Sequence, residues 1–236
     1  MDKIFGMEAK LDGYLGQDVV YEYERDGIAL KVHDGIMELS YATSSDEAKA
    51  LGIAAAYINA YILRSGLKIT ADFNHKWQKI KTGPVHHTLD LTAQVTVSER
   101  LQVVVTRQRT IQGKARIVTQ DAYDSASFVN DEILASRSLT DPTLRSALRY
   151  YADEVVDAEQ PMAGLYNAIE AITKHLAGDG REVLAKLAGK PKSYVGDLMQ
   201  TTQHSRHPKT NAIVNLPLDE CKARAKVLIN AYAQSL

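Results

Sequence analysis

The residues best suited to chemistry lie in one short polar segment of the C-terminal half, residues 203–211. Two imidazoles, a guanidinium, an amine and two amides within this segment suit contact with an anion or a phosphate group. Histidine also titrates closer to neutral pH than other side chains do. The candidate site residues are His204, Arg206, His207, Lys209 and Asn211.

This segment has two interpretations. In the functional one, His207 acts as general base or acid on a phosphodiester, and Arg206 stabilises the charge that develops on the phosphoryl group. His204, Lys209 and Asn211 then help to bind the phosphate. In the alternative, the segment is a solvated loop that joins two helices, with a proline ending the first helix. The residues alone leave both interpretations open.

The sequence motifs of several other enzyme and nucleotide-binding classes are absent from this chain. There is no phosphate-binding glycine loop, dinucleotide fingerprint, serine nucleophile elbow or zinc-protease motif. His86 and His87 are adjacent in a predicted strand, so they point to opposite faces and do not readily chelate one ion. Cys221 lies in the apolar stripe of a predicted helix, and Trp77 is expected in the core. We therefore predict no metal site and no cofactor.

Composition excludes several classes of protein. The chain has 236 residues, enough for one large domain or two domains of ordinary size. Its formal net charge of −1 gives no general attraction to polyanions, so any nucleic-acid site must be a local patch. The single cysteine excludes an intramolecular disulfide and indicates a reducing compartment. We find no export signal or membrane span and expect a cytoplasmic protein with no membrane insertion.

The N-terminal half must supply a sheet. Between about residues 19 and 118, apolar residues mostly alternate, as in strands with one buried face. The clearest alternation runs from Leu89 to Val97. Asp-Gly pairs at 26–27 and 34–35 indicate hairpin turns, and capping residues followed by strong helix formers predict a helix over 46–64. These patterns predict a mainly antiparallel sheet with one packed helix.

The rest of the chain follows the helix period. A helix over 121–135 is expected to close the sheet domain, and residues 136–142 form a polar connector, with Asp141 capping the next helix and Pro142 opening it. The predicted fold is α+β: an antiparallel sheet domain followed by an all-α helical bundle. The predicted domain boundaries are 1–138 and 139–236.

The helical half, residues 142–236, resembles the HEPN superfamily of small helical-bundle proteins from bacterial toxin, abortive-infection and stress systems. The resemblance rests on the number of helices, on the run Tyr194-Val195-Gly196-Asp197-Leu198, and on Arg206-His207 before the closing helix. Active nucleases of this superfamily carry Arg and His several residues apart, on one helical face. Here the two residues are adjacent and project about 100° apart on a helix, so the resemblance implies a degenerate nuclease site.

Two functions from different classes follow from these observations. The first is a cytoplasmic, bacterial-type interaction protein, in which the sheet domain recognises a partner and the degenerate HEPN-like domain forms a homodimer. The resemblance implies a stress or phage-defence system for it. The alternative is a protein that binds RNA or a nucleotide and cleaves RNA without metal, through His207 with Arg206 on the phosphate. Convergence of Arg206 and His207 in one groove would favour the second function.

Overall fold

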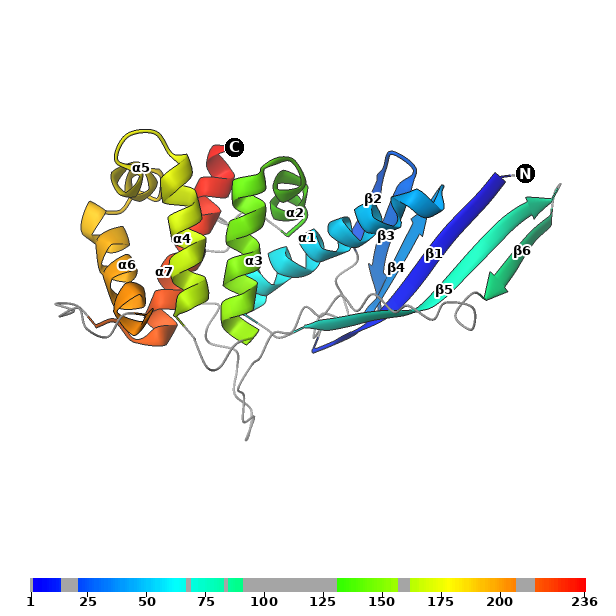
Figure 1. Ribbon diagram of the computed structural model, residues 1–236, viewed down its shortest axis with the longest axis horizontal. Helices are drawn as coiled ribbons and strands as arrows, with labels where there is room; N and C mark the ends of the chain where they lie inside the picture. Colours follow the sequence, from blue (N-terminus) through cyan, green and yellow to red (C-terminus); the bar gives the residue numbers. More distant parts are fainter. Residues whose placement is uncertain are drawn as a thin grey trace.

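Strands gather at one end of the molecule and helices at the other, and one long helix reaches from the first group to the second (Figure 1). The N-terminal antiparallel sheet with its packed helix and the C-terminal helices confirm the predicted α+β fold. This computed structural model describes residues 2–13, 21–66, 69–82, 85–90, 131–156, 162–206 and 215–236.

The described sheet has six strands in the order β2-β3-β4-β1-β5-β6, and every neighbouring pair is antiparallel. The first strand lies in the middle and pairs with both β4 and β5, so it joins the N-terminal hairpins to the later strands. The strands are β1 (Asp2–Asp12), β2 (Tyr21–Arg25), β3 (Ile28–His33), β4 (Ile36–Tyr41), β5 (Thr70–Thr82) and β6 (Val85–Asp90).

Two-residue turns connect β2 to β3 and β3 to β4. Asp26 and Asp34 have φ angles of 53° and 49°, and Gly27 and Gly35 both have φ of 74°. Two successive residues with positive φ are typical of the type I′ turn, whose twist matches that of the flanking strands. Aspartate tolerates this conformation and glycine adopts it without a steric penalty. The two predicted hairpin turns are therefore confirmed.

The helix α1 (Glu47–Ser65) covers one face of the sheet. Alternate strand positions, such as Met7, Leu30 and Leu39, are fully buried on the strands beneath it. The helix ends at Gly66, which has a left-handed φ of 64° and donates its N–H to the carbonyl four residues earlier. The helix predicted over 46–64 is confirmed within one residue at each end.

The opposite face of the sheet holds Trp77 of β5, which lies across Gly6 of β1. A Cβ at position 6 would clash with the indole ring, so only glycine permits this close approach. The Lys79 ammonium lies 4.5 Å from the centre of the indole. Trp77 is only 9% exposed, which confirms its predicted burial.

The helices of the C-terminal part pack around α4, which contacts α3, α5, α6 and α7. None of the described helices combines the length and the apolar character that crossing a membrane requires. The shorter helical elements are the 3-10 turn η1 (Ser44–Asp46), α2 (Asp131–Thr140) and α5 (Gly180–Leu187); the longer ones are α3 (Pro142–Val156), α4 (Ala163–His175), α6 (Lys192–Arg206) and α7 (Leu218–Ser235).

One apolar core continues from the sheet into the helices. Leu134 of α2 and Leu144 of α3 belong to the same buried cluster as Ile62 of α1 and Leu30 of β3. Because α1 packs on β3 and β4 and also on α2 and α3, this helix carries the core between the two parts. The predicted domain boundary between residues 138 and 139 stays a prediction.

The connector predicted over 136–142 is helical in its first five residues, because α2 continues to Thr140. Only Asp141 separates this helix from α3. The Asp141 carboxylate accepts a hydrogen bond from the Leu144 N–H at 2.5 Å, and Pro142 is the first residue of α3. The predicted cap and first helical residue are therefore confirmed.

The polar residues of this connector are compatible with a helix because their hydroxyl groups donate hydrogen bonds to backbone carbonyls of α2 itself. The Ser138 hydroxyl donates to the Ala135 carbonyl at 2.7 Å, and the Thr140 hydroxyl donates to the Arg137 carbonyl at 3.1 Å.

Two predicted elements extend beyond the described residues. Leu89 lies in β6, whereas residues 91–97 of the predicted strand are outside the described ranges. The same holds for residues 121–130 of the helix predicted over 121–135.

Candidate functional site

The first part of the predicted polar segment forms the C-terminal end of α6, where His204 and Arg206 occupy the last turn. Positions two residues apart on an α-helix lie about 200° apart around its axis, so these two positions do not share one face. His207, Lys209 and Asn211 lie outside the described residues, and their predicted roles stay predictions.

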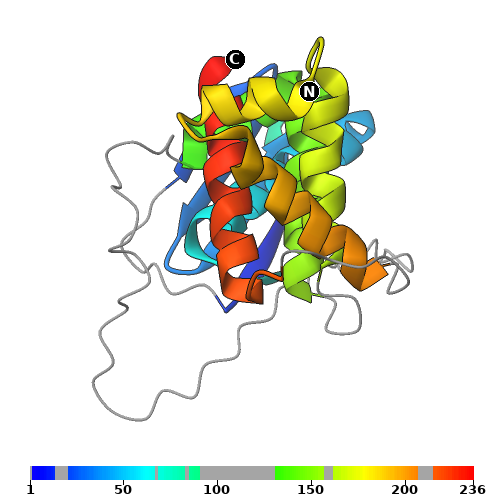
Figure 2. The ribbon, with the colours of Figure 1, turned by 90° about the vertical axis from the view of Figure 1, so that its left-hand side faces the viewer.

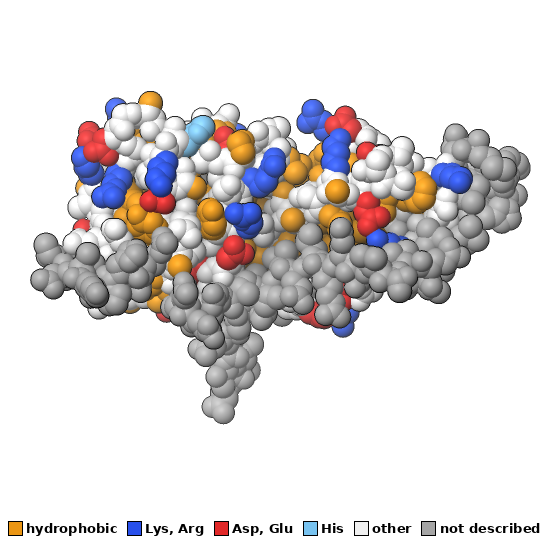
Figure 3. All heavy atoms as spheres, viewed as in Figure 1, with side chains coloured by type: hydrophobic (Ala, Val, Ile, Leu, Met, Phe, Trp, Pro, Cys, Tyr) orange, Lys and Arg blue, Asp and Glu red, His pale blue; other side chains and the backbone are white. Residues whose placement is uncertain are grey.

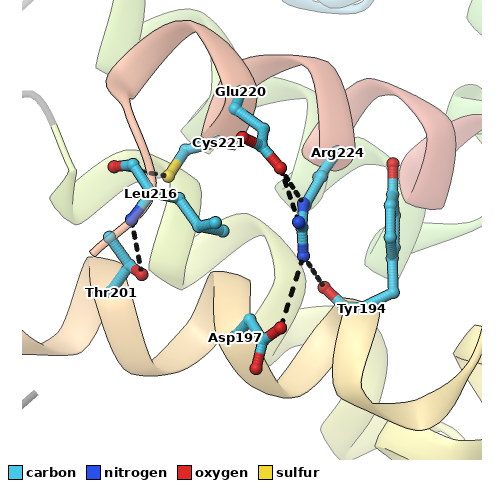
Figure 4. A network of polar contacts seen from close by, with 7 residues as sticks. All are labelled: Tyr194, Asp197, Thr201, Leu216, Glu220, Cys221 and Arg224. Atoms are coloured by element: carbon cyan, nitrogen blue, oxygen red, sulfur yellow. Dashed lines mark hydrogen bonds and ion pairs between the residues drawn. The ribbon is translucent and has the colours of Figure 1, made fainter. Parts of the chain in front are cut away.

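The end of α6 lies beside the N-terminal end of α7 (Figure 2). The Leu216 N–H donates to the Thr201 hydroxyl oxygen at 3.3 Å, and the Cys221 thiol lies 3.8 Å from the Leu216 carbonyl oxygen. These contacts, drawn in Figure 4, hold the segment before α7 against α6.

A buried carboxylate, that of Glu154 on α3, lies at this end of the helical part. Its side chain is 0% exposed, and neither of its oxygens has a hydrogen-bond partner among the described residues. The nearest cation among the described residues is Lys222 of α7, whose Nζ lies 3.5 Å from the Glu154 Oε1. Burial raises the pKa of Glu154 to about 7, because the attraction of Lys222 offsets only part of the lost hydration and Asp219 adds repulsion.

Close packing of α4 on α3 covers the base of the Glu154 side chain. Gly164 of α4 lies against the Tyr150 carbonyl oxygen, and a Cβ on this glycine would lie 2.6 Å from the Cβ of Glu154. Glycine therefore lets the two helices approach more closely than any other residue would allow.

The arrangement can bind and release a proton near neutral pH, but it does not form an assembled catalytic site among the described residues. Complete burial keeps Glu154 from touching a macromolecular substrate. Burial also raises the pKa of the Cys221 thiol to about 11, so this group stays protonated at neutral pH and is a poor nucleophile.

Arg224 of α7 holds α6 to α7 (Figure 4). Its Nε and Nη2 donate to the Glu220 carboxylate at 3.0 and 2.5 Å, and its Nη1 donates to the Tyr194 carbonyl at 3.3 Å. Asp197 lies 3.8 Å away, and the Tyr194 ring lies beneath the guanidinium at 4.6 Å. These contacts occupy the guanidinium, so Arg224 acts as a structural cation and not as a phosphate ligand.

A second buried carboxylate lies where α1 meets α2. Asp131 is 3% exposed, and both of its oxygens accept hydrogen bonds from the Arg64 Nε, at 2.6 and 2.8 Å. Lys226 of α7 donates to the Arg64 carbonyl oxygen at 3.0 Å. These bonds tie the end of the sheet-covering helix to two helices of the C-terminal part.

A hollow of about 330 Å³ opens beside this junction, between the sheet and the helices. The rings of Tyr23 and Tyr57 meet there edge to face, with centroids 6.2 Å apart, and Ile133 of α2 is 42% exposed. Burial raises the pKa of Tyr57 to about 12, and the charge of Glu132 adds to this effect. The walls are formed by Tyr23, Tyr57, Glu132, Ile133, Ser136 and Arg137.

Charge and metal ligands do not mark another site in the part of the chain that the structure describes. Acidic and basic side chains are interspersed on the face of the helical part that Figure 3 presents. No group of three His, Cys, Asp or Glu side chains in the described ranges is arranged to hold a metal ion.

Sequence reasoning identified neither the Glu154 environment nor the hollow. Glu154 follows an aspartate in an amphipathic helix, a pattern typical of a solvated face. Its burial depends on Gly164 and Lys222, and only the tertiary fold brings these residues to it. The hollow combines β2, α1 and α2, and no local pattern predicts their meeting.

The chain matches no protein-family model, no curated protein and no solved structure. The resemblance of residues 142–236 to the HEPN superfamily therefore stays a prediction. The function has to be argued from the geometry of the described residues.

Proposed function

We propose that the protein is a non-catalytic interaction protein that binds a protein partner at the junction between its sheet and its helices. The observation that carries this proposal is the hollow lined by two tyrosine rings and the exposed Ile133. Tyrosine is among the residues that contribute most binding energy to protein interfaces, and the apolar Ile133 adds surface that a partner can bury.

The junction is also rigid enough to present a preformed surface. Arg64 and Asp131 hold α1 to α2 with two short hydrogen bonds on one side of the hollow. The core continues through α1 from the sheet to the helices, so the walls belong to one packed body. A preformed surface binds more tightly because less conformational entropy is lost on association.

In this proposal the protein works in the cytoplasm of a bacterium, within a stress or phage-defence system, and its HEPN-like helical part is degenerate. That part also forms a homodimer, which light scattering on a chromatography column would detect as a doubled mass.

The test uses a photoreactive amino acid at position 133, in cells that naturally make the protein. We expect a discrete cross-linked partner, identified by mass spectrometry and then purified for a binding measurement. Ile133→Lys should weaken that binding about tenfold or more, because a charge replaces an apolar contact in the interface. The control, Leu187→Lys, changes an exposed leucine on α5, away from the junction, and should leave binding unchanged. Equal affinities for both variants would refute the proposal.

The second candidate is RNA or nucleotide binding, with metal-independent cleavage through Arg206 and His207. One observation favours it: Arg206, a cation suited to phosphate, is the last residue of α6 and is followed directly by His207 in the chain. Arg206→Ala should then lower RNA affinity and reduce its salt dependence by about one phosphate contact. His207→Ala should abolish cleavage at unchanged affinity. Wild-type protein that neither binds nor cleaves RNA at low salt would exclude this candidate.

A further inference from the structure

β2 forms one edge of the sheet, and β3 is its only paired strand among the described residues. A two-residue hairpin turn closes with a hydrogen-bonded pair, here Arg25 opposite Ile28, and such pairs then alternate along the strands. The backbone N–H and C=O groups of Glu22 and Glu24 therefore point away from β3. Groups of this kind at a sheet edge pair readily with another extended chain.

The hollow lies on the α1 side of this edge. Tyr23 is directly opposite Leu30, which is buried on the side of the sheet that α1 covers, and Tyr23 lines the hollow together with Tyr57. Side chains directly opposite each other on paired strands lie on the same face. A residue opposite Tyr23 in an added strand would therefore extend its side chain into the hollow.

The walls favour a long cationic side chain. Tyrosine rings accept both an aliphatic stem and a cation, and Glu132 supplies a carboxylate on α2. Arg137 donates to the Ala233 carbonyl, which directs one of its amino groups towards α7. A volume of about 330 Å³ lies at the lower end of the roughly 300–1,000 Å³ of ligand pockets, so the hollow suits one side chain better than a cofactor.

We infer that the partner is a protein with an extended segment, which adds as a strand to the outer edge of β2 and places a lysine or arginine beside Tyr23, Tyr57 and Glu132. This inference rests on the proposed function and names the chemistry of the partner. Backbone hydrogen bonds to Glu22 and Glu24 supply affinity, and the hollow supplies specificity for the basic residue.

The test uses the full-length protein and a short, soluble synthetic peptide of alternating threonine and valine around a central lysine. Fluorescence anisotropy measures its affinity, and hydrogen exchange measures protection of the Glu22 and Glu24 amides. We expect binding that protects both amides. Replacing the central lysine by glutamate should weaken binding about tenfold, because the like charge of Glu132 repels it. Methylating the peptide nitrogens that face β2 should weaken it by a similar factor, about tenfold, through lost hydrogen bonds.

A matched pair of protein variants tests the hollow itself. Glu132→Gln should lower the affinity of the lysine peptide about threefold, and it should not lower the affinity of the glutamate peptide. Glu182→Gln removes an exposed carboxylate on α5 and should change neither affinity. Unfolding curves of both variants establish that the fold is kept.

Three results would overturn the inference. They are an affinity insensitive to nitrogen methylation, an equal affinity for the lysine and glutamate peptides, and full protection of the Glu22 and Glu24 amides in the free protein. The last result would mean that another segment of the same chain already occupies the edge. If the partner cross-linked at position 133 binds while these peptides do not, the proposed function stands and only this inference fails.

Discussion

Asp131 and Glu154 are two buried helical carboxylates that meet their cations in opposite ways. Both oxygens of Asp131 accept hydrogen bonds from Arg64, at 2.6 and 2.8 Å. Glu154 faces Lys222 at 3.5 Å, and its oxygens have no hydrogen-bond partner among the described residues. The difference shows that a nearby opposite charge is not enough to stabilise a buried carboxylate, which also needs donors at hydrogen-bonding distance.

The two sites differ in position as well as in bonding. Asp131 lies at the junction that holds α1 to α2, beside the hollow of the proposed interface. Glu154 lies at the far end of α3, beside Lys222 of α7. The satisfied pair therefore supports the architecture of the proposed surface, whereas the unsatisfied carboxylate makes the stability of the helical part depend on pH.

The largest expected effect is the loss of the satisfied pair. Asp131→Ala should lower the free energy of unfolding by about 3 kcal/mol, because it removes a hydrogen-bonded ion pair in which the carboxylate is buried. Urea denaturation at neutral pH measures this loss. The control is Lys49→Ala, which removes an exposed ion pair with Asp26 at 3.5 Å and should change stability by less than about 0.5 kcal/mol. Equal losses of unfolding free energy in the two variants would mean that the buried Arg64–Asp131 pair stabilises the fold no more than an exposed ion pair does.

The next effect is a pH dependence caused by Glu154. Its pKa is about 7 in the folded protein, whereas a solvated glutamate, as in the unfolded chain, has a pKa of 4.5. Between these two pH values the folded state therefore holds a proton that the unfolded chain has released. The free energy of unfolding should therefore rise as pH falls from about 7 to about 4.5, by roughly 3 kcal/mol from this group.

Glu154→Gln isolates that contribution, because the amide carries no charge at either pH. We expect the variant to be at least as stable as the wild type at pH 8, and its advantage to vanish or reverse at pH 5, where the glutamate is protonated. Urea denaturation of both proteins across this range gives the difference. A constant difference at all pH values would show that Glu154 does not titrate within it.

A smaller effect is expected from filling the glycine contact at which α4 packs against Glu154. Gly164→Ala should destabilise the fold by about 2 kcal/mol, since its methyl group meets the Tyr150 carbonyl and the Glu154 Cβ. Gly196→Ala is the matched control, because a Cβ at that position of α6 has no neighbour within 4 Å among the described residues. It should stabilise by up to about 1 kcal/mol through helix propensity. Stabilisation by both changes would show that α4 can move away from α3.

The sequence predicted the elements whose signals are local. Asp-Gly pairs marked both hairpin turns, and Asp141 with Pro142 marked the start of α3, because turn and cap preferences depend on neighbouring residues alone. The alternation of Phe5, Met7, Ala9 and Leu11 would also have revealed β1, which the predictions omitted.

Other features depend on residues far apart in the chain. β5 was not predicted, although Ala71, Phe73 and Trp77 occupy odd positions; its register against β1 shifts near Glu8, so Trp77 lies on the face opposite to Ala71 and Phe73. The pairs of Asp131 with Arg64 and of Glu154 with Lys222 join residues from different helices. No period or motif identifies such partners, so the burial and hydrogen bonding of each carboxylate could be learned only from the fold.

The smallest effect sharpens the comparison by removing the Lys222 cation beside Glu154. Lys222→Met should raise the pKa of Glu154 further above 7 and lower the free energy of unfolding at pH 8 by about 1 kcal/mol, because the ionised carboxylate loses its attraction. At pH 5 the carboxyl group is neutral and the change should be close to zero. Carbon NMR of the Glu154 carboxyl group follows the pKa, and urea denaturation at both pH values follows stability. Lys186→Met, on the exposed side of α5, should move neither quantity. An equal loss of stability at both pH values would instead assign the role of Lys222 to packing by its aliphatic stem.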